Sequence, residues 1–264
     1  MQQLLDIMQA LRNKETGCPW DVAQDFQSLA PYVIEEAYEV VDAIERQDYR
    51  ELKSELGDLL LQVVFHAQLA NEHGLFDFED VIASINQKMI SRHPHVFGDA
   101  VIKTQAEQTI SWEQIKKLER AEKDIADSSA LAGLSQGMPE TIRALKLQKK
   151  AATVGFDWPN VNGVFEKLDE EIAEIRVEFD SGAGHEALQD EIGDLLFVSV
   201  NLARHAKVDF GGALRHANRK FERRFRAMEK IAEQNQTSIS QLSLSEQETL
   251  WQHVKLQEKI NESI

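Results

Sequence analysis

The sequence predicts an all-α protein built from two related halves. Its apolar residues recur mainly at steps of three and four, which indicates helices, and no convincing run alternates as a strand would. One such stripe is formed by Leu188, Ile192, Leu195, Ser199 and Leu202. In addition, one acidic pattern occurs twice with the same internal spacing. A self-similarity of about 135 residues is too long for a solenoid unit and indicates a duplicated domain.

Long helices are expected along both halves. In the first half they cover residues 2–13, 28–46, 49–73, 77–91 and 105–123. In the second half they cover residues 139–153, 161–180, 185–206, 209–234 and 245–261. Helices joined by short turns pack as antiparallel hairpins, but two long helices cannot enclose a core alone. We therefore expect each half to complete a four-helix bundle in a homodimer.

A change of composition marks the boundary between the halves. From Asp124 to Pro139 the chain turns to Ser, Ala, Gly and Gln and loses its helical period, and Pro139 suits the first turn of the next helix. The predicted domains are residues 1–125 and 139–264, with a linker at residues 126–138.

Charge and composition limit the possible functions. With 42% hydrophobic and 28% charged residues, the 264-residue chain can form an ordinary globular core. The net charge of −16 argues against a nucleic-acid-binding surface. The single cysteine, Cys18, excludes a disulfide framework and fits a cytoplasmic protein. We expect no signal peptide and no membrane span, because the N-terminus lacks a basic segment and the longest apolar stretch, residues 59–70, is short and interrupted.

The repeated acidic pattern predicts two metal sites. It consists of Glu35, Glu36, Glu39, Glu55 and Asp58 in the first half and of Glu170, Glu171, Glu174, Glu191 and Asp194 in the second. Acids three apart share one helix face, and the apolar stripes beside them force these faces together. Two carboxylates about 5 Å apart repel by roughly 3 kcal/mol, so a cluster needs a cation, and oxygen ligands favour Mg²⁺ or Mn²⁺. The alternative is a solvated helix face, which would tend to interleave its acids with lysines.

A glycine interrupts the second acidic segment of each half, at Gly57 and Gly193. Glycine inside a helix costs roughly 1 kcal/mol relative to alanine. We therefore expect a close helix contact at both positions, with plain tolerance of the glycine as the alternative.

Basic and aromatic residues of the second half form a candidate nucleotide site. Lys220 and Arg224 lie four apart and would project from one helix face as a phosphate clamp, unless they pair with surface acids such as Glu222. Lys167, one turn before Glu171, is placed to join them.

Two tryptophans of the second half, Trp251 and Trp158, are candidates for stacking on a base, with Lys255 beside Trp251 to meet phosphate. Packing in the core is the alternative for both rings. Their counterparts in the first half are Trp112, with Lys116, and Trp20.

In the first half, prolines interrupt the residues that correspond to this basic helix face. Lys88 and Arg92 correspond to Lys220 and Arg224 but run directly into Pro94, which ends their helix, and Pro31 stands close to the position of Lys167. We therefore expect the C-terminal domain to be the main catalytic domain.

Other chemistries find no support in the residue pattern. No histidines have a zinc spacing, and no histidine follows a glutamate by three residues as in di-iron bundles. No glycine-rich phosphate loop, nucleophile elbow or Cys/His dyad occurs.

These motifs resemble the MazG family of nucleoside triphosphate pyrophosphohydrolases, in the long form with two tandem domains. The acidic pattern fits the family in both copies, as do Gly-Cys-Pro-Trp-Asp at residues 17–21, Arg-His-Pro-His-Val-Phe at 92–97 and Lys-Phe-Glu-Arg-Arg-Phe at 220–225. The similarity covers almost the whole chain.

The resemblance implies an all-α homodimer that converts NTPs to NMP and pyrophosphate with Mg²⁺, tolerates several bases and clears surplus nucleotides. By the family pattern, metal would be held by Glu171, Glu174, Glu191 and Asp194. Nucleotide would be contacted by Lys167, Glu170, Lys220, Arg224, Trp251 and Lys255. The candidate general base is Glu170 or Glu171. Alternatives are a dUTP or dCTP hydrolase, a phosphoribosyl-ATP pyrophosphohydrolase, or a nucleotide sensor without catalytic activity.

Overall fold

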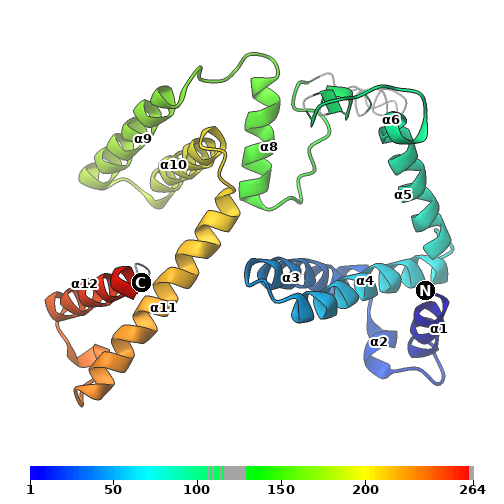
Figure 1. Cartoon of the computed structure of the whole chain (residues 1–264), viewed down its shortest axis with the longest axis horizontal. Helices are drawn as coiled ribbons and strands as arrows, with labels where there is room; N and C mark the ends of the chain where they lie inside the picture. Colours follow the sequence, from blue (N-terminus) through cyan, green and yellow to red (C-terminus); the bar gives the residue numbers. More distant parts are fainter. Residues whose placement is uncertain (106, 109, 113–114, 116–128, 262–264) are drawn as a thin grey trace. The chain divides into compact units, whose positions relative to one another are not determined.

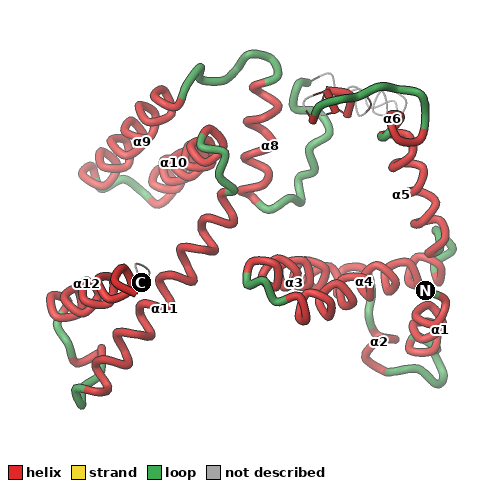
Figure 2. The backbone as a smooth tube through the Cα atoms, in the orientation of Figure 1, coloured by secondary structure: helices red, strands yellow, loops and turns green. Residues whose placement is uncertain are grey.

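All regular structure in the described part of the chain is helical. The computed structural model describes residues 1–261 except 106, 109, 113–114 and 116–128. Within these residues Figure 2 shows helices joined by loops and no strand, so the predicted all-α fold is confirmed. None of the helices in these residues is both long and apolar enough to cross a membrane.

The chain divides into two compact units, Met1–Lys123 and Asp124–Ile264. The expected linker at residues 126–138 lies beside this division. Residues 126–128 fall outside the described part, and residues 129–138 form turns and irregular chain.

The first unit is organised around a long antiparallel hairpin. Within the described residues its helices include α1 (Gln2–Leu11), α2 (Pro19–Ala23), α3 (Phe26–Glu45), α4 (Tyr49–Glu72), α5 (Phe78–Arg92) and α6 (Pro94–Phe97). Helices α3 and α4 form the hairpin (Figure 1). Asp25 and Asp48 accept hydrogen bonds from backbone amides at the starts of these helices. The core lies where α1, α3 and α5 meet α4, around Met8, Leu29 and Leu69. This packing fixes the α3–α4 pair that carries the first acidic pattern.

The second unit repeats this plan. Its helices are α8 (Glu140–Ala152), α9 (Val161–Ser181), α10 (His185–His205), α11 (Phe210–Gln234), the 3₁₀ turn η1 (Ile239–Gln241) and α12 (Leu244–Asn261). Helices α9 and α10 form the hairpin, and α8 packs on α10. Gly182 ends α9 with a φ of 69°, in the left-handed region that glycine adopts without strain. Helix α12 packs along α11 (Figure 1).

The long helices lie within a few residues of their expected positions. In the part of the chain that the structure describes, the short elements α2, α6 and η1 were not predicted from the sequence. Two of them begin with a proline, Pro19 and Pro94, whose fixed φ and missing amide suit the first position of a helix. The helix expected at 105–123 falls largely outside the described residues.

Candidate active site

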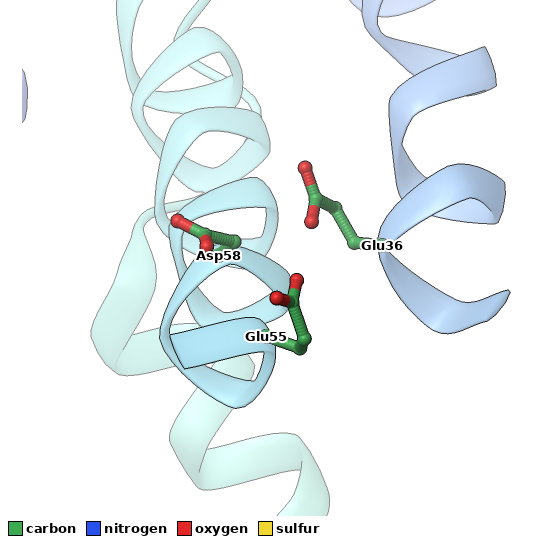
Figure 3. Close-up of side chains that lie close together, drawn as sticks. All are labelled: Glu36, Glu55 and Asp58. Carbon is green, nitrogen blue, oxygen red and sulfur yellow. The ribbon is translucent and has the colours of Figure 1, made fainter. Parts of the chain in front are cut away.

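The first acidic pattern converges between α3 and α4. Glu36 projects from α3 toward Glu55 and Asp58 on α4 (Figure 3), and one carboxylate oxygen of each lies within 4.8 Å of the others. Burial and, next, the charge of Asp58 raise the pKa of Glu36. Burial and then the charge of Glu39 raise the pKa of Glu55. Glu35 and Glu39 are exposed on α3, outside the group of three.

The second pattern converges in the same way between α9 and α10. Glu171 and Glu174 of α9 meet Glu191 of α10, with one oxygen of each within 4.8 Å of the others. Burial and, next, the charge of Glu174 raise the pKa of Glu191. Asp194 is exposed and lies outside this group of three, although its charge also raises the pKa of Glu191.

Glu171 is the buried member of the C-terminal cluster, with 1% of its surface exposed. The Nζ atom of Lys167 lies 2.6 Å from its Oε1 and donates a second hydrogen bond of 2.9 Å to Glu170. The hydrogen bond to Glu171, followed by that to Glu170, raises the pKa of Lys167. The other oxygen of Glu171, Oε2, is buried without a hydrogen-bond partner. Because a buried, unpaired carboxylate oxygen is costly, this atom calls for a ligand.

The C-terminal cluster therefore fits a hard divalent cation. Three convergent carboxylates supply only oxygen ligands, and the unpartnered Oε2 of Glu171 provides a donor atom directed away from bulk water. A solvated helix face, the alternative considered from the sequence, does not account for a glutamate that is almost completely buried.

The expected close helix contacts at Gly57 and Gly193 are wrong for the described chain. A Cβ atom added at either position would have no neighbour within 4 Å. Each glycine is simply exposed on its helix, where the intrinsic penalty is small enough for the packed hairpin to tolerate.

Arg224 of the predicted phosphate clamp lies on α11 and pairs with an acid of α12, which is the alternative considered from the sequence for this residue. Arg224 Nε donates to Oε2 of Glu258 over 2.7 Å, and Arg223 Nε donates to Oε1 over 2.8 Å. These bonds lower the pKa of Glu258 to about 2. The guanidinium of Arg224 also lies 5.7 Å from the centre of the Trp251 ring, which packs against Phe221. Glu222, the acid considered from the sequence, pairs with Arg226 instead.

The structure groups the predicted residues in two sets. Lys167 and Glu170 lie with the acids on α9, whereas the others lie on α11 and α12: Lys220, Arg224, Trp251 and Lys255. In the described part of the chain, none of these four makes a hydrogen bond or ion pair with the acidic cluster.

Trp158 lies apart from both sets, in the loop between α8 and α9. Its ring rests on the backbone of Gly163, where any Cβ atom would collide with it. The ring lines a cavity together with Phe156 and Phe197. The neighbouring Asp157 forms an ion pair with Arg204 of α10. The hydrogen bond from Arg204 lowers the pKa of Asp157, and this effect outweighs burial, which raises it.

The first unit places its tryptophans similarly. Trp112 Nε1 donates to the backbone oxygen of Arg92 over 3.0 Å, so this ring lies against the arginine-bearing helix as Trp251 does in the second unit. Lys88 is exposed on α5, and Trp20 packs edge-on against Tyr32. Lys116 lies outside the described residues.

The fold and the clusters define an all-α protein of two units, each with convergent carboxylates between the helices of a hairpin. Residues 24–97 and 161–228 both match the MazG nucleotide pyrophosphohydrolase domain. The chain belongs to this family.

Two similar sequences agree with this assignment. The chain is 49% identical over 259 residues to the nucleoside triphosphate pyrophosphohydrolase of Escherichia coli (strain K12), covering 98% of each chain. It is 42% identical over 254 residues to the nucleoside triphosphate pyrophosphohydrolase/pyrophosphatase MazG of Thermotoga maritima, covering 96% of this chain and 95% of that one. The crystal structure of a mazG-related protein from T. maritima shares 28% identity, with a TM-score of 0.38, over 44% of this chain and 99% of that one.

Proposed function

We propose that this chain is a Mg²⁺-dependent nucleoside triphosphate pyrophosphohydrolase that produces NMP and pyrophosphate from several NTPs in the cytoplasm. The observation that carries the proposal is the cluster of Glu171, Glu174 and Glu191, with its buried, unpartnered oxygen and adjoining Lys167. Full-length similarity to two proteins named as nucleoside triphosphate pyrophosphohydrolases supports the same substrate class.

Each residue of the proposed site has a role in the hydrolysis of the triphosphate. Water attacks the α-phosphorus, the bond to the oxygen bridging to the β-phosphorus breaks, and pyrophosphate leaves with that bonding pair. Glu170 or Glu171 accepts the proton of the water. Lys167, adjoining both glutamates, stabilises negative charge on the phosphates, and Lys220, Arg224 and Lys255 bind the rest of the triphosphate.

The metal ligands in this proposal are Glu171, Glu174, Glu191 and Asp194. A bound Mg²⁺, or Mn²⁺ in its place, would supply charge neutralisation for the triphosphate and for the departing pyrophosphate. Asp194 is exposed and lies outside the group of three acids. In this proposal its carboxylate binds the metal ion that the three acids hold.

A homodimer is part of the proposal. Large apolar side chains, including Ile172 and Val177 of α9 and Leu196 of α10, are exposed in the single chain. Apolar surface of this kind on a helical hairpin is typical of an interface that completes a bundle. Light scattering should report twice the mass of 30.0 kDa, and Leu196→Glu should shift the protein toward the monomer.

The test of the function is a pyrophosphate-release assay with a panel of NTPs and dNTPs. The proposal expects pyrophosphate and the matching monophosphate from several bases in the presence of Mg²⁺. Activity confined to dUTP or dCTP would identify a more specialised hydrolase. Binding of NTP without any release of pyrophosphate would overturn the proposal in favour of a sensor.

A further inference from the structure

Helix α12 supplies a carboxylate that holds two arginines of α11. Oε2 of Glu258 accepts a hydrogen bond of 2.7 Å from Nε of Arg224, and Oε1 accepts one of 2.8 Å from Nε of Arg223. The side chains of Glu258 and Arg224 are 20% and 16% exposed, whereas that of Arg223 is 57% exposed. The carboxylate therefore joins an inner arginine to an outer one, with one oxygen directed to each.

Glu258 meets the guanidinium of Arg224 at a single edge. A guanidinium carries five N–H donors, one on Nε and two on each terminal nitrogen. Nε donates to Glu258, and among the described residues no hydrogen bond of Arg224 involves Nη1 or Nη2. Four donors on the terminal nitrogens are therefore left for a ligand, and a pair of them fits two phosphate oxygens side by side.

Arg223 keeps the carboxylate from covering those donors. A carboxylate beside an arginine often binds it through two nitrogens at once. Here Oε1 is held by Arg223, so Oε2 alone binds Arg224. One negative charge between two guanidinium groups also leaves a net positive charge. The group of Arg223, Arg224 and Glu258 therefore attracts an anion although it contains an acid.

The indole of Trp251 restrains the same arginine at its face. The guanidinium carbon of Arg224 lies 5.7 Å from the centre of the Trp251 ring, and that ring packs on Phe221 with 5.4 Å between centres. Trp251 and Glu258 are seven residues apart on α12, so they lie on one side of the helix. Arg224 is thus held by a carboxylate at one edge and by a ring at one face.

The repeat contains this acid twice but the outer arginine once. Glu119 occupies the position of Glu258 in the first half, three residues after the lysine of the repeated Trp-x-x-x-Lys motif, and lies outside the described residues. The position of Arg223 is taken there by Ser91. The first half therefore has the acid without the arginine that would hold its second oxygen.

We propose that Glu258 is a positioning residue for the pyrophosphohydrolase reaction, which holds the Nε edge of Arg224 so that the terminal nitrogens bind the triphosphate. The inference rests on the proposed function, because that function assigns phosphate to Arg224. Pairing with an acid and clamping of phosphate, the alternatives for this arginine in the sequence, then occur together. The opposite role is a latch, in which Glu258 competes with phosphate for Arg224. The contact through Nε favours positioning.

The test compares binding and turnover in Glu258→Gln. Glutamine keeps the size of the side chain but has one acceptor oxygen and no charge, so it cannot hold both arginines. The dissociation constant of inorganic tripolyphosphate with Mg²⁺, measured by calorimetry, and the KM for ATP should each rise about tenfold, because a charge-assisted hydrogen bond that orients Arg224 is lost. The kcat should change much less, because this contact binds substrate and transition state alike. A lower dissociation constant would identify a latch and overturn the inference.

A double-mutant cycle separates positioning from the packing of α12 on α11. Arg224→Lys should itself weaken tripolyphosphate binding, because an ammonium group does not present paired donors. If Glu258 acts through Arg224, adding Glu258→Gln to Arg224→Lys causes no further loss. Equal losses in both backgrounds would indicate a purely structural role and overturn the inference. A lower melting temperature of Glu258→Gln with both constants unchanged would do the same, as would tripolyphosphate binding that Arg224→Lys leaves unaltered.

Glu258→Asp is the second variant. It keeps the charge, which should preserve the fold, but withdraws the carboxylate by one methylene, so the KM and the tripolyphosphate constant should stay above those of the unaltered protein. Full recovery of both constants would show that charge rather than position matters, and would contradict the inference.

Glu222→Gln is the matched control on α11, because it removes a carboxylate that pairs with Arg226 instead. It should change neither constant, and a rise equal to that of Glu258→Gln would also overturn the inference. The tripolyphosphate titrations do not depend on turnover. An unaltered protein that binds tripolyphosphate but releases no pyrophosphate would therefore count against the proposed function separately.

Discussion

Lys167 and Glu171 form a 2.6 Å ion pair one helical turn apart on α9, inside the C-terminal acidic cluster. The pair compensates one oxygen of a buried carboxylate and leaves the other without a hydrogen-bond partner. The cluster thus contains a cation of the protein itself, the ammonium group of Lys167, and a carboxylate oxygen, Oε2 of Glu171, that a metal ion could bind.

Mg²⁺ or Mn²⁺ should raise the melting temperature of the protein. A cation at a hundredfold excess over its dissociation constant stabilises the folded state by about 2.7 kcal/mol, which corresponds to roughly 5 to 10 °C. Glu174→Gln removes a charged ligand and should reduce the shift. Asp169→Asn, on the opposite face of α9, should keep it. A melting temperature that neither cation changes would contradict the metal assignment.

Charge-neutral replacements in the cluster should abolish most of the turnover. Glu171→Gln and Asp194→Asn are each expected to lower pyrophosphate release at least about a hundredfold, because losing a charged ligand removes several kcal/mol of transition-state stabilisation. Circular dichroism should show that the helices persist. Near-normal turnover of Asp194→Asn would mean that this exposed residue, which lies outside the group of three, is not a ligand.

The two units should contribute unequally to catalysis. The double variant Glu36→Gln with Asp58→Asn should keep much of the turnover, whereas Glu171→Gln with Asp194→Asn should abolish it. The reason is that, among the described residues, a lysine pairs with the C-terminal cluster at Glu171, and the cavity in that unit is lined by Asn201 where the first unit has the buried Phe65. The reverse result would place the active site in the first unit, and equal partial losses would indicate two working sites.

Glu258 should stabilise the α11–α12 contact in a pH-dependent way. Its pKa of about 2 in the folded protein lies below the ordinary value of 4.5, so its contribution is complete above pH 4.5 and is lost as the pH falls toward 2. Glu258→Gln should therefore cost about 1 to 2 kcal/mol of unfolding free energy at pH 7 and much less at pH 3. Chemical denaturation at both pH values measures this difference.

Glu222→Gln serves as the control for that measurement. Glu222 forms an exposed pair with Arg226 within one helix, and such pairs contribute little. If Glu258→Gln lost the same stability at pH 7 and at pH 3, the ionised carboxylate of Glu258 would not be what stabilises the contact with the two arginines.

The long helices and the acidic clusters could be predicted because both depend on local spacing. The expected helix at 161–180 corresponds to Val161–Ser181, and its acids meet those of the next helix because a short turn at Gly182 reverses the chain. The sequence also pointed to Lys167, which stands one turn before Glu171.

Contacts between distant helices could not be predicted in this way. Arg224 and Glu258 are 34 residues apart, and their pairing depends on how α12 packs on α11. The cavity in the second unit was missed because Gln148 and Asn201, which line it, are neutral amides on different helices and carry no charge pattern. Its signals in the sequence were Trp158, which lines it, and the difference between Phe65 and Asn201 at equivalent positions of the repeat.

That difference has a consequence for how the two copies tolerate mutation. At Phe65 the selected property is volume, because the ring fills a core and a smaller residue would leave a void. At Asn201 the side chain accepts hydrogen bonds from Arg204 beside an open cavity, so hydrogen-bonding capacity matters more there than volume. In a saturation library, protein abundance should therefore follow side-chain volume at position 65 and hydrogen-bonding capacity at position 201. One position of the repeat thus carries a packing requirement in the first unit and a hydrogen-bonding requirement in the second.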